Sequence, residues 1–332
     1  MHILLTGAGG FVARRIALDL LEAGHSVRGS LRDPAAQETP LREALRGHLT
    51  DPASLDRLDI VRLDLSKDEV WPEAARGTDA ILHTASPFPL EQTGDPEAVV
   101  RPAVDGTLRA LRAARDAGVG RAILTSSTVA VVNGPRPEGR PRDERDWSVE
   151  DHPNANAYVR SKTLAERAAW EFAEAEGLAL TALNPGFVLG PPLGEERNTS
   201  LRVVERLLSG KDPMVPPLKF ETVDVRDVAR AHLAALDDPA TAGERFVLVA
   251  GGLWMADIAR IAKALAPDRR IPTRTAPAVL IRGLALMDPA LRGVVPILGR
   301  DEPVSGDKAR ARLGIDYIPP EAAARASVEA LL

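Results

Sequence analysis

Short apolar stretches alternate with longer amphipathic stretches along most of this chain, and the alternation limits the folds that it can adopt. Seven short stretches have the residue types of strands: His2–Thr6, Ser26–Ser30, Ile60–Asp64, Ala80–Thr84, Ala122–Ser126, Ala179–Asn184 and Arg245–Val249. The clearest helical periods lie at Val12–Ala23, Val99–Ala117 and Ala155–Glu176. Strands that alternate with helices form parallel sheets covered on both faces. We therefore predict an α/β fold with a doubly wound parallel sheet.

The composition excludes several classes of function. The chain has 332 residues and a formal net charge of −5, with no basic run among aromatic residues, so we expect no nucleic-acid partner. It has no cysteine, which excludes disulfides, thiolate nucleophiles and cysteine-ligated metals, and we predict no metal site. It starts with a strand pattern instead of a basic and apolar leader, and no apolar run approaches about 18 residues. We therefore expect a cytoplasmic protein with no membrane partner.

A glycine-rich turn, in the stretch TGAGGFVA, follows the first predicted strand. Such a turn presents backbone amides at a helix N-terminus, where the partial positive charge suits a pyrophosphate. The spacing is Gly-x-x-Gly-x-x-Ala, and the Gly-x-Gly-x-x-Gly spacing is absent because Val12 stands at its last position. We predict a Rossmann-type dinucleotide site. Its expected residues are Thr6, Gly7, Gly9, Gly10, Phe11 and Val12. The alternative is a turn that needs glycine only for a positive φ.

The pattern also suggests where the chain divides. Proline-rich segments such as GPPLGEER and GKDPMVPPLKF interrupt the alternation after Asn184, and the strand pattern RFVLVAG then returns. We expect a dinucleotide-binding Rossmann domain at residues 1–190, with a return of roughly residues 221–250. A smaller, mainly C-terminal substrate-binding region is expected at residues 191–220 and 251–332.

The ends of the second and third predicted strands indicate the choice of cofactor. An acidic residue about 20 positions after the glycines would bind the ribose 2′-hydroxyl of NAD. Here Ser30 is small, and Arg32 offers a guanidinium that suits a 2′-phosphate. We therefore predict NADP(H) in preference to NAD(H). The alternative is that Arg32 is a solvated loop arginine with no role in binding. Asp64 and Leu65 are expected to hold the adenine, although Asp64 is equally well explained as a loop cap.

The segment NAYVRSK carries the candidate catalytic residues. Tyr158 and Lys162 are four residues apart in a strongly helical stretch, so their side chains share one face of the helix. A phenol is a poor acid at neutral pH unless a nearby cation stabilises its phenolate, and Lys162 can supply that charge. Ser127 follows the fifth predicted strand and is our candidate to bind the carbonyl oxygen of a substrate. The alternative for Tyr158 and Lys162 is a pair of surface residues without a catalytic role. The alternative for Ser126 is a role in forming the turn.

Together these features resemble the extended short-chain dehydrogenase/reductases of the NAD-dependent epimerase/dehydratase superfamily. Within them the chain is similar to dihydroflavonol-reductase-like carbonyl reductases, which include cinnamoyl-CoA and methylglyoxal/ketone reductases. The stretches that carry the resemblance are TGAGGFVA, GSLRDP, LHTASPF, AVDGTLRALRAAR, LTSSTVAV, YVRSK, NPGFVLGP and VDVRDVARAH. The likeness extends to about His232 and is weak from Gly251 onward.

The resemblance implies roles for further residues. It implies a catalytic set of Ser127, Tyr158 and Lys162, with Tyr158 and Lys162 also touching the cofactor. The remaining cofactor contacts expected on this basis are His83, Thr84, Ala85, Ser86, Ser126, Pro185, Gly186, Phe187, Val188 and Ser200. His83 taken alone is more simply read as a buried core histidine.

The expected function is NADPH-dependent reduction of an aldehyde or ketone to the alcohol, with Tyr158 as general acid and Ser127 stabilising charge on oxygen. A sugar-nucleotide epimerase is the main alternative. A dehydratase is disfavoured because Ser127, Thr128 and Val129 include no carboxylate where elimination needs an acid. A non-catalytic NADP sensor is a further alternative, but such relatives usually lose the tyrosine and lysine.

Apolar residues are expected around the substrate. The predicted pocket residues are Phe88, Val131, Leu189 and Met214, although each could equally belong to the core. An apolar pocket favours small or medium aldehydes and ketones over UDP-sugars, which need donors for two phosphates. Arg197, Arg202 and Arg206 are the nearby basic residues. The sequence is also compatible with a homodimer.

Overall fold

The computed structural model describes residues 1–86, 95–152, 154–286 and 294–332. Within these ranges seven parallel strands form the central sheet, in the order β3-β2-β1-β4-β5-β6-β9. Their bounds are β1 His2–Thr6, β2 Ser26–Leu31, β3 Leu58–Arg62, β4 Ala80–His83, β5 Arg121–Thr125, β6 Ala179–Pro185 and β9 Arg245–Leu248. The doubly wound α/β fold is confirmed, with all seven predicted strands. The third strand begins at Leu58 rather than Ile60 and ends before Asp64.

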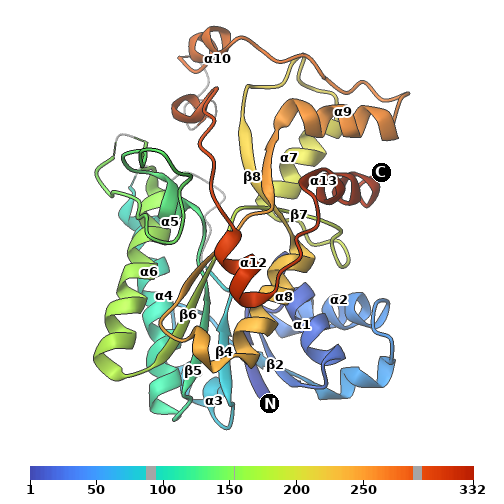
Figure 1. Ribbon diagram of the computed structural model, residues 1–332. Coiled ribbons are helices and arrows are strands. Elements are labelled where there is room, and N and C mark those ends of the chain that lie inside the picture. The colour runs from blue at the N-terminus through green and yellow to red at the C-terminus, as the bar shows by residue number, and fades with distance from the viewer. Residues whose placement is uncertain (87–94, 153, 287–293) are drawn as a thin grey trace.

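Helices cover both faces of this sheet (Figure 1). One face carries α3 (Trp71–Ala75), α4 (Glu97–Asp116) and α6 (Ala157–Glu176), and α4 packs along α6. The other carries α1 (Phe11–Glu22), α2 (Pro34–Arg46) and α8 (Val225–Asp237), and α1 packs along α8. The three predicted helices correspond to α1, α4 and α6. No helix within the described ranges combines the length and apolar character that a membrane span requires.

Burial of both faces explains why the central strands β1 and β4 are largely apolar. Leu4 of β1 packs with Ile81 in the cluster beneath α3 and α4, whereas Leu5 packs with Ile16 in the cluster beneath α1 and α8. Successive side chains of a strand point to opposite faces, so a strand covered on both sides needs apolar residues throughout. The carboxyl ends of these strands are left as the edge where polar residues can meet.

A second sheet lies beyond the carboxyl ends of the first (Figure 1). Its strands are β7 (Phe187–Leu189), β8 (Lys219–Asp224) and β10 (Gly251–Trp254), with β8 parallel to β7 and antiparallel to β10. Around it pack α7 (Thr199–Leu208), α9 (Met255–Leu265), α10 (Ala278–Leu284) and α13 (Pro320–Glu329). The sequence analysis did not predict this sheet.

The remaining elements that the structure describes are short helices. They are α5 (Val129–Val132), α12 (Asp307–Leu313) and the short 3-10 helices Pro52–Arg57, Asp68–Val70, Pro239–Thr241 and Val295–Ile297. Within the expected return, β8 belongs to the second sheet, whereas α8 and β9 pack with the first. The division at residue 190 stays a prediction.

Candidate active site

The glycine-rich turn joins β1 to α1 at the carboxyl edge of the main sheet. Gly7 has a φ of +69°, and a Cβ there would lie 3.0 Å from the Cβ of Ala85, so both conformation and space require glycine. The amide of Gly7 donates to Ser30 Oγ at 3.0 Å, and the amide of Gly10 donates to the Gly7 carbonyl at 2.9 Å. The N-terminus of α1 follows Gly10, which has no side chain to cap it. Glycine is therefore required here for its positive φ, and the same turn has a geometry that suits an anion.

A cleft of about 720 Å³ opens beside this turn. Segments that follow β1, β2, β3 and β4 line it, as expected for a ligand at the point where the strand order reverses. The predicted cofactor residues in its lining are Gly7, Gly10, Phe11, Val12, Arg32, Asp64, Leu65, Thr84, Ala85 and Ser86. The fold thus brings together residues from four separate loops.

Asp64 has a local structural role at one end of this cleft. Its carboxylate accepts hydrogen bonds from the amide and the hydroxyl of Ser66 at 2.9 and 2.7 Å. These bonds, with smaller contributions from the charges of Arg32 and Lys67, hold the pKa of Asp64 below its ordinary value. Asp64 therefore caps its own loop, which is the alternative stated above, and it also lines the cleft.

Thr6 and His83 are buried at the ends of β1 and β4, beneath the cleft. Thr6 Oγ1 accepts from the amides of Thr84 and Ala85 at 3.1 and 3.2 Å, and it lies 2.9 Å from His83 Nδ1. Burial, together with the charge of Lys162, lowers the pKa of His83 to about 3. The imidazole is therefore neutral at physiological pH and supports the segment that lines the cleft.

Tyr158 lies in the first turn of α6 and contacts Ser127. The helix begins after Asn156, whose Oδ1 accepts from the amide of Val159 at 2.9 Å. Burial raises the pKa of Tyr158, and a side-chain hydrogen bond with Ser127 opposes that rise. The loop after β5 and the start of α6 therefore bring two of the three predicted catalytic residues into contact.

Lys162 follows Tyr158 by one turn on the same helix. Burial lowers the pKa of its ammonium to about 8, and the carboxylate of Glu166 opposes that effect. The charge of Lys162 also acts on His83, which places the ammonium between α6 and β4. An ammonium of this pKa remains mostly protonated at pH 7, where it favours a phenolate nearby. Ser127, Tyr158 and Lys162 thus form one cluster.

Two other predicted cofactor contacts have partners within the protein. Ser126 is buried, and its hydroxyl donates to Glu166 at 2.5 Å. Gly186 lets β8 approach, because a Cβ there would lie 2.1 Å from the carbonyl oxygen of Glu221. Pro185 is the last residue of β6 and comes directly before this glycine. The segment is therefore packed closely against the second sheet.

The rest of the predicted cofactor set lies around the second sheet. Phe187 begins β7, and its ring stacks on that of Phe220 in β8 with centroids 4.1 Å apart. Val188 is buried in the same strand, and Ser200 is buried in the first turn of α7. None of these residues is among those that line the 720 Å³ cleft in the described structure.

The described substrate-pocket candidates lie in two different apolar clusters. Val131 is fully buried among valines near the end of β9, and Leu189 is fully buried in the apolar cluster of the second sheet. Met214 is partly buried against that second cluster. These placements match the core role that was the alternative for each residue. Phe88 lies outside the described residues.

Several residues that line the cleft were not among the predicted cofactor contacts. The lining also contains Arg101, Pro102, Asp105 and Arg109 of α4, and Glu196 and Asn198 of the loop before α7. Their position depends on how α4 and this loop pack against the glycine-rich turn. Local periodicity does not report such long-range packing.

Arg14 connects the glycine-rich turn to that loop. Its side chain is buried, its Nε donates to the Gly9 carbonyl, and its Nη1 donates to the Leu193 carbonyl, both at 2.9 Å. Burial lowers the pKa of Arg14, and the charge of Glu196 opposes that effect. Gly9 therefore contributes a carbonyl to this link, and a Cβ on it would lie 3.3 Å from Leu31.

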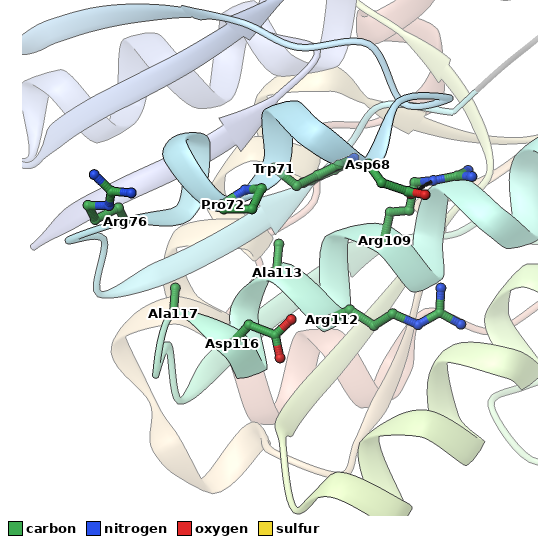
Figure 2. A pocket seen from close by; sticks show the side chains of 9 residues that line it. All are labelled: Asp68, Trp71, Pro72, Arg76, Arg109, Arg112, Ala113, Asp116 and Ala117. Atoms are coloured by element: carbon green, nitrogen blue, oxygen red, sulfur yellow. Dashed lines mark hydrogen bonds and ion pairs between the residues drawn. The ribbon is translucent and has the colours of Figure 1, made fainter.

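A second cavity, of about 480 Å³, lies between α4 and the segment around α3 (Figure 2). Asp68 and Arg109 point toward one another and form an ion pair, whereas Arg76 and Arg112 lie at opposite ends. No lining residue in the described structure carries a hydroxyl, an imidazole or an amine. The described residues also contain no group of three or more His, Asp or Glu side chains placed to hold a metal ion. This cavity therefore contains none of the three predicted catalytic residues.

Comparisons with known proteins agree with this geometry. The sequence pattern of the NAD dependent epimerase/dehydratase family matches residues 3–251. The chain is 38% identical over 276 residues to cinnamoyl-CoA reductase 1 of Arabidopsis thaliana, covering 82% of this chain and 77% of that protein. It is 30% identical over 280 residues to dihydroflavonol 4-reductase of Zea mays, covering 82% and 76%.

The structure is similar over its whole length to that of yeast methylglyoxal/isovaleraldehyde reductase Gre2 complexed with NADPH. The TM-score is 0.81 at 28% sequence identity, and the match covers 100% of this chain and 98% of that one. The resemblance inferred from the sequence is therefore confirmed at the level of the family. The chain belongs to the NAD dependent epimerase/dehydratase family, in its extended short-chain dehydrogenase/reductase group.

Proposed function

We propose that this protein is an oxidoreductase that uses NADPH to reduce an aldehyde or ketone to the alcohol. The observation that carries the proposal is the contact between Ser127 and Tyr158 with Lys162 one turn away. This cluster adjoins the end of β4, whose following residues line the cleft. Similarity to named reductases supports the same class of reaction.

The cleft has the features that NADP(H) requires. The N-terminus of α1 offers backbone amides to a pyrophosphate, and Arg32 offers a guanidinium to a 2′-phosphate. Ser30 stands where an acidic residue would repel that phosphate, and Leu65 provides an apolar surface for the adenine. The NADPH in the yeast relative's structure supports the same choice. We therefore assign NADP(H) in preference to NAD(H).

The chain's residues account for the proton transfer in this reaction. Bound NADPH supplies the hydride. Tyr158 donates its hydroxyl proton to the carbonyl oxygen of the substrate, and Ser127 donates a hydrogen bond to that oxygen. Lys162 stabilises the phenolate that remains. Because burial raises the pKa of Tyr158, the phenol is protonated at neutral pH before the transfer.

We propose a small or medium apolar carbonyl compound as the substrate. The stacked rings of Phe187 and Phe220 support an apolar environment next to the end of β6. Two of the three basic residues named above for a sugar nucleotide have acidic partners: Arg197 pairs with Glu205 at 2.9 Å and Arg206 with Asp212 at 2.7 Å. The name of the yeast relative, a methylglyoxal/isovaleraldehyde reductase, also agrees with this class.

The test is NADPH oxidation measured against aromatic and aliphatic aldehydes, ketones and diketones. We expect turnover of at least one apolar carbonyl compound, which would also exclude a purely sensing role. Calorimetry of the NADP-loaded protein with UDP- and dTDP-sugars tests the epimerase alternative. Micromolar binding of such a sugar, with no turnover across the carbonyl panel, would contradict the proposal.

Three further expectations remain proposals with their own tests. Limited proteolysis would report the division at residue 190, light scattering would report a homodimer, and cell fractionation would report a cytoplasmic location.

A further inference from the structure

Glu166 is a fully buried carboxylate one turn beyond Lys162 on α6. Its Oε2 accepts from Ser126 Oγ at 2.5 Å and from Asn184 Nδ2 at 2.7 Å. Its Oε1 accepts from Arg245 Nε at 2.6 Å and from Trp170 Nε1 at 3.3 Å. Burying a charge is costly unless it is paired and hydrogen-bonded, and these donors meet that requirement. Both carboxylate oxygens therefore have hydrogen-bond donors inside the protein.

Two of these hydrogen bonds lead directly to the segment that carries Ser127. Ser126 is its chain neighbour, and the same Asn184 Nδ2 that donates to Glu166 also donates to the carbonyl of Ser127 at 3.1 Å. Helix α6 therefore holds both partners of the catalytic contact: it carries Tyr158 itself, and through Glu166 it holds the loop of Ser127. A change at Glu166 should alter the distance between them.

The third donor, Arg245, is itself held in place. Its Nη1 donates to the carbonyls of Glu144 and Asp146 at 2.8 and 3.0 Å, and its guanidinium lies 3.7 Å from the ring centroid of Trp147. This strand residue of β9 therefore cannot follow the carboxylate freely if the carboxylate moves. It would remain as a buried cation if Glu166 lost its charge.

The charges around Lys162 come from two elements. Helix α6 contributes Glu166, and β4 contributes His83, whose imidazole is neutral. Glu166 is thus the anion next to the Lys162 ammonium among the groups that act on it in the described structure. Arg245, which pairs with Glu166, is the nearest cation on β9.

We propose that Glu166 is a positioning residue for the reduction: through Ser126 and Asn184 it holds Ser127 against Tyr158. This inference rests on the proposed function, but it also predicts a property that can be measured without turnover. Neither the sequence analysis nor the similar proteins assign this role to Glu166.

The principal variant is Glu166→Gln, with Glu171→Gln as the matched control because Glu171 is an exposed glutamate on the same helix. A glutamine keeps one acceptor oxygen and has an NH₂ group in place of the other, so either Ser126 and Asn184 or Arg245 and Trp170 lose their acceptor. We expect kcat to fall at least tenfold while NADPH affinity changes less than threefold. We also expect the alkaline limb of kcat against pH to move down by about one pH unit, because a buried cation loses its neighbouring anion.

A second readout does not depend on turnover. The chain has only two tyrosines, so in a Tyr317→Phe background the ultraviolet absorbance of phenolate reports Tyr158 alone. Loss of the negative charge at residue 166 should lower the midpoint of this titration by about one pH unit, whereas Glu171→Gln should not change it. If the wild type reduces no carbonyl compound but Glu166→Gln still shifts the Tyr158 titration, the result contradicts the proposed reductase function and leaves the role of Glu166 standing.

The inference is overturned if folded Glu166→Gln retains the wild-type kcat, pH profile and Tyr158 titration. If Glu166→Gln does not fold, Glu166→Asp is used to test the proposal instead. Aspartate keeps the charge but shortens the reach by one methylene, so we expect a lower kcat with an unmoved alkaline limb. A folded Glu166→Asp protein with the wild-type kcat would overturn the positioning role.

Discussion

The side chains of Thr6 and His83 meet at 2.9 Å where β1 and β4 end side by side. Thr6 Oγ1 accepts from the amides of Thr84 and Ala85, so its own proton is directed to Nδ1 of His83. The neutral imidazole then carries its proton on Nε2. This arrangement fixes the start of the segment 84–86, which lines the cleft, and it requires an uncharged histidine.

Two buried neutral histidines should make the protein less stable in acid. Burial lowers the pKa of His83 to about 3 and that of His232 to about 4, from an ordinary value of 6.5. Between these values the unfolded chain binds more protons than the folded one, so the free energy of unfolding falls as pH falls below 6.5. Each histidine should contribute about 1.4 kcal/mol per pH unit in this window.

Urea denaturation between pH 4.5 and 7.5 measures this effect. Carboxyl groups titrate in part of the same range, so the informative quantity is the difference between wild type and His232→Gln. In a plot of the free energy of unfolding against pH, the slope for the variant should be smaller than that for the wild type by the amount that one bound proton contributes. Identical slopes for the two proteins would show that His232 does not contribute.

Replacing Tyr158 by phenylalanine should remove turnover and preserve cofactor binding. The variant loses the hydroxyl that donates the proton, which is worth on the order of 10² or more in rate. NADPH affinity, measured by fluorescence, should stay close to the wild-type value, because the glycine-rich turn and Arg32 lie in other loops. A variant that kept more than a tenth of the wild-type turnover would rule out Tyr158 as the proton donor.

Arg32→Ala should erase most of the preference for NADPH over NADH. Losing a charged hydrogen bond to the 2′-phosphate weakens binding by about 1.5 to 3 kcal/mol, roughly tenfold to a hundredfold. NADH has no 2′-phosphate, so its affinity for the variant serves as the internal control. Equal affinity of the unaltered protein for both cofactors would disprove the assignment.

Arg14→Met should destabilise the protein and weaken NADPH binding. Methionine fills the space of the arginine stem but leaves the carbonyls of Gly9 and Leu193 without their donor, at a cost of about 1 to 3 kcal/mol. The loop that places Glu196 and Asn198 at the cleft would then be held less firmly. Thermal unfolding and a fluorescence titration measure the two effects.

The exposed Arg136 provides the control for this substitution. Arg136→Met should change the free energy of unfolding by no more than about 0.5 kcal/mol. Equal effects of the two substitutions would mean that the link made by Arg14 has no special importance.

Local patterns were sufficient to predict the main sheet, and they also indicate that Tyr158 and Lys162 share one helix face. The central strands β1 and β4 are buried on both faces, so their apolar runs are visible in the sequence. Tyr158 and Lys162 share a helix face because four residues make about one turn, and Gly7 is required by its own positive φ. These properties depend on neighbours along the chain, and such neighbours can be read from a sequence.

Tertiary packing decided the remaining features. Strand β7 has three residues and β10 has four, too few to show a period, and each joins β8 through pairings distant in sequence. Val131 and Leu189 were candidates for a pocket, and only the packing of other elements buried them. Glu166 stands one turn from Lys162, so the spacing could have revealed it. Its contacts with Asn184 and Arg245 could not be predicted, because they exist only where separate strands meet the helix.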